Sequence, residues 1–95
     1  MDNEFNYLIA KYKRSVRTAA QAHEFIRFAP REKALGVLEV AETLGVDEAL
    51  SLGYDVDRAS FLLDELNRAE KDRAFFQREA AEAWRELNRQ RSVRW

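Results

Sequence analysis

The side chains best suited to chemistry are one histidine, one arginine and three glutamates that fall on different expected helices. His23 is the only histidine, and both His23 and Arg73 interrupt stripes of apolar residues. If the first and last helices run parallel, Glu39 or Glu42 comes to nearly the same level as this pair, and Glu70 lies one turn below Arg73. Such a level predicts either a buried polar layer that fixes helix register or a small anion-binding or catalytic pocket. We favour the structural layer.

The motifs that commonly carry catalysis or cofactor binding are absent from the sequence. It has no His-Glu-x-x-His pair, no glycine-rich phosphate loop and no cysteine, so the usual signals of zinc, nucleotide and thiolate chemistry are missing. Asp55 and Asp57 are two residues apart, but both suit the start of a helix, where carboxylates accept backbone N–H groups. We therefore expect a protein that is not an enzyme and that binds no cofactor and no metal.

The longest expected element is a helix from Val56 to Arg91, a run that contains neither glycine nor proline. Its apolar residues recur at spacings of three and four, which places them on one side of a helix. They are Ala59, Leu62, Leu63, Leu66, Ala69, Phe76, Ala80, Ala83, Trp84 and Leu87. At about 1.5 Å per residue such a helix is roughly 54 Å long, so the rest of the chain must be organised around it.

Three shorter helices are expected before it. The first covers residues 4–28 and ends at Pro30, because proline disfavours helix in the residue before it. The second ends at Gly45, which suits a left-handed cap, and a short third helix of residues 47–52 ends at Gly53. The apolar stripe of the first helix is Phe5, Leu8, Ile9, Tyr12, Val16, Ala19, His23 and Ile26.

These elements predict an all-α protein with one domain over residues 1–95. The expected architecture is a small helical bundle of helix 1, helix 2 plus the short helix 3, and one long C-terminal helix, with coiled-coil-like packing. Short connections favour antiparallel neighbours, so helix 1 runs up, helices 2 and 3 run down and the last helix runs up. In that arrangement the last helix overshoots the others by about 16 Å at its C-terminal end.

The overshooting segment predicts a protein interface. Its apolar residues would have no cover from the same chain, and uncovered apolar stripes mark interaction surfaces. Two aromatic residues on the opposite side of the long helix are further candidate anchors for another chain. The predicted interface residues are Phe61, Phe75, Ala80, Ala83, Trp84 and Leu87. We therefore expect a homodimer, another protein partner, or both.

Two basic clusters supply an alternative function. The first is Lys11, Lys13, Arg14 and Arg17, and the second is Arg85, Arg89, Arg91 and Arg94 with nearby tryptophans. Arginine and aromatic side chains together can hold phosphates and stack on bases. However, the formal net charge is −1, which gives the whole chain no attraction for nucleic acid.

Composition sets the remaining expectations. No apolar run approaches the 18 or so residues that a membrane span needs, and no signal peptide is visible, so we expect no membrane association and a cytoplasmic location. Twelve arginines against four lysines are typical of a bacterial or phage protein. The function predicted from the sequence is a non-catalytic protein-interaction module, a small helical regulator or adaptor that self-associates through its long C-terminal helix. The alternative is a nucleic-acid-binding accessory protein.

Overall fold

The computed structural model describes residues 2–93, and for residues 3–91 it also describes the side chains. Within that range the chain forms four helices and no strand: α1 (Asp2–Phe28), α2 (Arg31–Leu44), α3 (Val46–Ser51) and α4 (Val56–Val93). The all-α class and the long C-terminal helix expected from the sequence are confirmed. Asp55 caps α4 as expected, because its Oδ1 accepts the backbone N–H of Arg58 at 3.0 Å.

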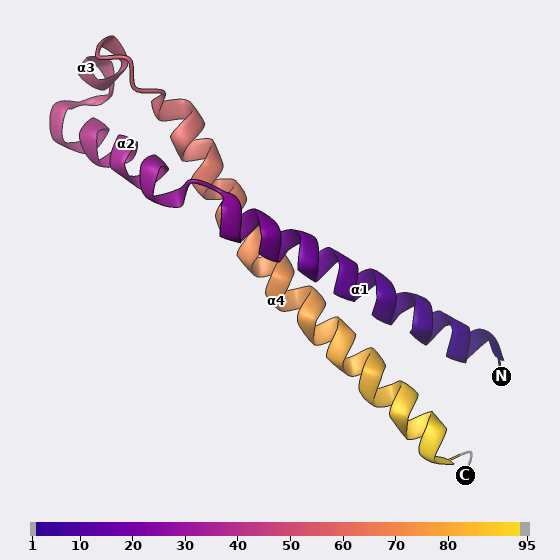
Figure 1. The fold of residues 1–95 in the computed structure, drawn as a ribbon. Coiled ribbons are helices and arrows are strands. Elements are labelled where there is room, and N and C mark those ends of the chain that lie inside the picture. Colours follow the sequence, from indigo (N-terminus) through magenta and orange to yellow (C-terminus); the bar gives the residue numbers. More distant parts are fainter. Residues whose placement is uncertain (1, 94–95) are drawn as a thin grey trace.

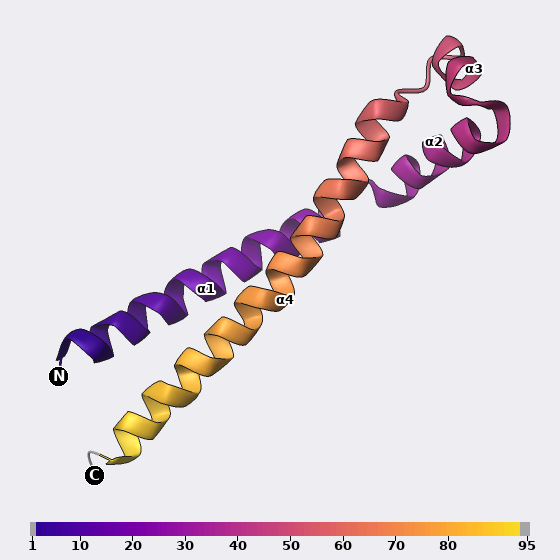
Figure 2. The same ribbon diagram turned by 180° about the vertical axis from the view of Figure 1, so that it is seen from behind.

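The helices form one elongated hairpin (Figures 1 and 2). α1 runs antiparallel to the C-terminal half of α4, and α2 continues in the same direction along the N-terminal half of α4. α3 forms the tip, where the chain turns back. The rod measures 68 × 17 × 16 Å. Its start and its end therefore lie together at one extremity.

This topology corrects the expected three-layer arrangement. α1 and α4 are antiparallel rather than parallel, and α1 packs on α4 without contacting α2 among the described residues. The physical reason is the connection at Ala29 and Pro30, which bends the chain slightly but does not reverse it. The C-terminal half of α4 is consequently covered by α1, and the predicted uncovered overshoot does not exist.

The core between α1 and α4 follows a seven-residue repeat. In α4 the positions that face the partner helix alternate at spacings of three and four without interruption, and in α1 they do the same. They are Ala59, Leu62, Leu66, Ala69, Arg73, Phe76, Ala80, Ala83, Leu87 and Gln90 in α4, and Phe5, Leu8, Tyr12, Ser15, Ala19, Ala22 and Ile26 in α1. This is the packing pattern of an antiparallel coiled coil.

The core of α1 differs from the predicted stripe in two places. Ser15 is 2% exposed, whereas the neighbouring Val16 is 43% exposed, and His23 is exposed while Ala22 is half-buried. A strict repeat of 3.5 residues keeps one line of positions against the partner, and a stripe chosen by side-chain size drifts off that line. Small residues are suited to this core because they let the two helices approach closely.

The far half of the rod has its own small core. Ala41, Ala49 and Val56 pack together from α2, α3 and α4, and Ala49 is completely buried. Gly45 connects α2 to α3 with a φ of +94°, which side chains other than glycine rarely adopt. The tip is therefore fixed by tight packing of small residues at its base.

Candidate protein-interaction surface

The repeat divides the surface of the hairpin into two faces, one on each side of the core. We call the first the small-residue face: Asn6, Ile9, Lys13, Val16, Ala20, His23 and Arg27 of α1 with Ser60, Leu63, Asn67, Glu70, Ala74, Gln77, Ala81, Trp84, Asn88 and Arg91 of α4. We call the second the charged face: Glu4, Tyr7, Lys11, Arg14, Thr18, Gln21, Phe25 and Phe28 with Arg58, Phe61, Glu65, Arg68, Asp72, Phe75, Glu79, Glu82, Glu86 and Arg89. Four of seventeen residues carry a charge on the first face, against eleven of eighteen on the second.

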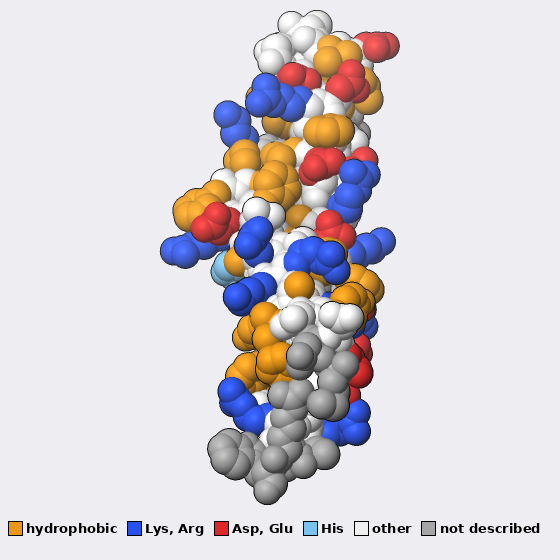
Figure 3. All heavy atoms as spheres, turned by 90° about the vertical axis from the view of Figure 1, so that its right-hand side faces the viewer, with side chains coloured by type: hydrophobic (Ala, Val, Ile, Leu, Met, Phe, Trp, Pro, Cys, Tyr) orange, Lys and Arg blue, Asp and Glu red, His pale blue; other side chains and the backbone are white. Residues whose placement is uncertain are grey.

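Two hollows confirm that these faces lie on opposite sides of the core. One of about 210 Å³ is lined by Phe5, Ile9, Tyr12, Trp84, Leu87, Asn88 and Arg91, which belong to the core and the small-residue face. Another of about 260 Å³ is lined by Thr18, Gln21, Ala22, Phe25, Glu65, Arg68, Ala69 and Asp72, which belong to the core and the charged face. No residue lines both. Figure 3 shows how hydrophobic and charged side chains alternate over the part of the surface turned to the viewer.

The charged face is held together across the helices by an ion pair. Lys11 Nζ lies 2.8 Å from Glu79 Oε2, and this hydrogen bond raises the pKa of Lys11 above its ordinary value. On the same face the guanidinium of Arg89 hydrogen-bonds Glu86 and lowers the pKa of that carboxyl. These pairs satisfy part of the charge of this face within the chain, and the face also exposes the aromatic side chains of Tyr7, Phe28 and Phe61.

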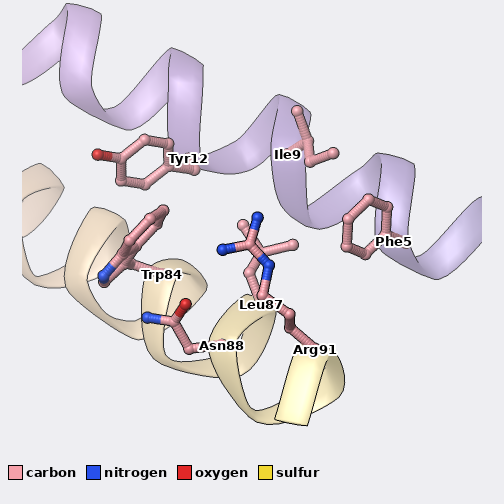
Figure 4. A pocket seen from close by; sticks show the side chains of 7 residues that line it. All are labelled: Phe5, Ile9, Tyr12, Trp84, Leu87, Asn88 and Arg91. Carbon is pink, nitrogen blue, oxygen red and sulfur yellow. The ribbon is translucent and has the colours of Figure 1, made fainter. Parts of the chain in front are cut away.

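The small-residue face has an aromatic centre near the start of α1. Tyr12 and Trp84 pack with ring centroids 5.5 Å apart, and Figure 4 shows Leu87 and Arg91 beside them, reaching between the helices toward Ile9. Trp84 remains 48% exposed. It was expected in the apolar stripe of α4, but it lies at the edge of the core and opens onto the hollow.

A seven-residue repeat of small uncharged residues runs along α4 on this face. It consists of Ser60, Asn67, Ala74, Ala81 and Asn88, and all but the half-buried Asn88 are exposed. The sequence contained this signal, but it becomes visible only when the core repeat is known, because the residues are neither large nor chemically distinctive. A line of small side chains lets another helix approach closely.

The same face continues onto α2 in the far half of the rod. Arg31, at the start of α2, forms an ion pair with Glu70 of α4, and Glu70 belongs to the small-residue face. Leu35 follows one turn later and is 50% exposed. A separate hollow of about 530 Å³ opens on the other side of α2, between Lys33 and Val37 and the start of α4.

The residues predicted to form a polar layer are only partly brought together. His23 Nδ1 and Arg73 Nη1 are hydrogen-bonded at 3.2 Å, but His23 is exposed and Arg73 only half-buried, so the layer is not buried. Glu70 pairs with Arg31 instead. Glu39 and Glu42 are exposed on α2, which packs on the other half of α4. Among the described residues no group of three or more histidines and acids is arranged to hold a metal ion.

The predicted interface residues are divided by the structure. Ala80 and Ala83 are buried against α1, and Leu87 is half-buried there. Trp84 lies on the small-residue face. Phe61 and Phe75, which are 66% and 47% exposed, lie on the charged face. Trp84 therefore lies on the opposite side of the core from Phe61 and Phe75, and these three side chains cannot contact one partner together.

The two basic clusters lie at the same end of the rod, because α1 and α4 are antiparallel. Ion pairs within residues 3–91 involve Lys11 and Arg89 but not Lys13, Arg14 or Arg17. Arg85 hydrogen-bonds the backbone oxygen of Ala81. Arg91 lines the hollow of Figure 4, and Arg94 lies outside the described residues.

Comparison with known proteins gives no relative for this hairpin: no protein-family model, curated protein or solved structure matches the chain. None of the helices within the described residues combines the length and the apolar character that crossing a bilayer demands.

Proposed function

We propose that the chain is a non-catalytic protein-interaction module that binds helical surfaces through its small-residue face. The observation that supports this is the line of uncharged small residues along α4, next to the exposed Trp84 and its apolar hollow. Exposed tryptophans beside hollows are frequent energetic centres of interfaces. The charged face, whose ion pairs are satisfied internally, is the side that remains in solvent.

A two-layered rod also benefits from a partner. Stable domains bury the apolar side of each helix against further layers, but here Leu66 is the largest apolar residue that is almost completely buried. Val16, Leu35 and Trp84 are between 43% and 50% exposed. A helical partner on the small-residue face would cover these side chains. Each Å² of apolar surface removed from water in this way would stabilise the complex by about 25 cal/mol.

A photocrosslinking experiment tests this function. We expect benzoylphenylalanine in place of Ala81 to cross-link the chain to a polypeptide in cells, because Ala81 lies in the small-residue face. The matched control places the same label at Glu82, which is the next residue and lies on the charged face. Cross-linking at Glu82 but not at Ala81, or at neither position, contradicts the proposal.

Nucleic-acid binding is a second candidate, favoured by the position of both basic clusters at one end of the rod. It requires an affinity for DNA or RNA that falls steeply with salt. It also requires that Lys13→Glu, Arg14→Glu and Arg17→Glu together abolish that affinity, while Lys33→Glu in the far half does not. Fluorescence anisotropy with labelled oligonucleotides at about 50 and 200 mM salt measures this, and absence of binding at the lower salt excludes the candidate.

A further inference from the structure

We propose that the partner on the small-residue face is a second copy of this chain, packed antiparallel to the first about a two-fold axis. The product is a four-helix dimer over most of the rod's length, with the axis near Asn67 and Ala74. This inference rests on the proposed function and names its partner. It follows from the distribution of charge along the rod, from the position of exposed apolar residues and from the dimensions of the face.

The two halves of the rod carry opposite net charges. Its near half, residues 3–29 and 68–91, carries twelve basic and seven acidic side chains, whereas the far half, residues 30–67, carries three basic and nine acidic ones. Two parallel copies would place like charges together. Two antiparallel copies place the basic half of each against the acidic half of the other, and such complementarity selects both partner and orientation.

The apolar residues of the face come into register in this orientation. The α2 segment that holds Leu35 lies beside Ala59 and Leu62 of α4, because Ala34 and Val37 line one hollow with these two residues. Ala59 and Leu62 lie nine to twelve positions before an axis near residue 71, or about 14–18 Å along the helix. The same distance beyond the axis reaches the level of Ala81 and Trp84. Leu35 of one copy therefore meets the hollow beside Trp84 of the other, and this contact is repeated by symmetry.

The face is large enough for a stable dimer. A standard protein–protein interface buries about 800 Å² on each partner, and a face on a rod of 68 × 17 × 16 Å exceeds that area when the copies overlap along most of their length. The line of small residues from Ser60 to Asn88 lets the two α4 helices approach across the axis. Crossing angles near 20° are usual in such bundles.

Molar mass by light scattering tests whether the dimer uses this face. We expect the wild-type chain to have twice its 11.1 kDa mass and Ala81→Glu to be a folded monomer, because the new charge lies in the interface. The control is Phe75→Glu, which adds the same charge on the charged face and should remain dimeric. Circular dichroism shows whether each variant keeps its helices, since glutamate is a good helix former.

Spin labels test the orientation. The chain contains no cysteine, so Asn67→Cys and Asn88→Cys each give one labelled site per copy on the small-residue face. In the antiparallel dimer the two labels at position 67 are about 12 Å apart along the rod and those at position 88 roughly 50 Å apart. In a parallel dimer both distances are short.

The outcomes separate this inference from the function on which it rests. A dimer with a short distance at position 67 and a long one at position 88 supports it. A dimer with two short distances, or one that survives Ala81→Glu and is lost with Phe75→Glu, overturns it. A wild-type monomer also overturns it, but if Ala81 still cross-links to a different protein the proposed function stands. A monomer without cross-linking at Ala81 removes both.

Discussion

The His23–Arg73 contact shows what the polar residues within the apolar stripes do in this hairpin. Arg73 occupies a core position of α4 and reaches out of the core to His23 on the small-residue face, at 3.2 Å. A long side chain can cover apolar neighbours with its methylene groups while its charge stays in water. The pair therefore joins α1 to α4 without forming an enclosed site.

The sequence could indicate this contact but not its surroundings. Both residues were recognisable because they interrupt apolar stripes, yet their proximity was expected from a parallel arrangement that does not exist. In the antiparallel hairpin they meet because His23 is close to the end of α1 and Arg73 is near the middle of α4. Glu39 and Glu42 were assigned to the same level for the wrong reason and lie in the other half of the rod, whereas Glu70 is one turn from Arg73 on α4 and pairs with Arg31.

At the scale of the element, helix boundaries were predictable because they have local causes. Pro30, Gly45, Gly53 and Asp55 mark the ends of helices in the sequence, and the structure places the ends within a few residues of them. Helix direction was not predictable, because a break at proline is compatible with a reversal or with a continuation. The sequence also did not reveal the full set of α1 positions that face α4. Ser15 is one of these positions and is buried, but a serine gives no hydrophobic signal.

The break at Pro30 has a consequence for the register of the core. The repeat in α1 ends with Ile26, and the half-buried Ala29 continues its spacing just beyond the helix. The buried positions of α2 are Ala34 and Ala41, with Val37 half-buried. One residue more than a heptad separates Ile26 from Ala34. A continuous helix would therefore turn α2 by about 100° away from α4. The break absorbs this extra residue.

Deleting Pro30 should accordingly stabilise the hairpin. The deletion places Ala29, Ala34, Val37 and Ala41 in one uninterrupted heptad with Ile26, and α1 and α2 can join as one helix. We expect a gain on the order of 1 kcal/mol from restored backbone hydrogen bonds, or about 4–8 °C in thermal midpoint by circular dichroism. Pro30→Ala is the control, because it keeps the extra residue and should gain less. A lower thermal midpoint for the deletion than for Pro30→Ala would show that the core positions of α1 and α2 do not belong to one continuous heptad repeat.

For the whole molecule, the separation of charge along the rod matters more than the formal net charge of −1. The alternation of basic and acidic segments is visible in the sequence. Its meaning is not, because the basic segments of residues 11–31 and 73–91, which flank an acidic segment, come to lie together only when α1 and α4 are antiparallel. The hairpin thereby converts three alternating segments into two oppositely charged halves, which is the arrangement that the proposed antiparallel dimer requires.

A charge exchange between the two halves tests this polarity. One variant carries Lys13→Glu and Arg91→Glu in the basic half, and the other carries Glu39→Lys and Glu42→Lys in the acidic half. Each alone should self-associate more weakly than wild type, because one of its halves loses most of its charge: the basic half falls from +5 to +1 in the first variant, and the acidic half from −6 to −2 in the second. Mixed together, the two variants should form a heterodimer, which native mass spectrometry distinguishes by mass. Wild-type dimers should also weaken as salt screens these charges. If each variant dimerises as well as wild type and the mixture shows only random pairing, charge does not select the antiparallel partner, and the small-residue face alone would have to determine how two copies meet.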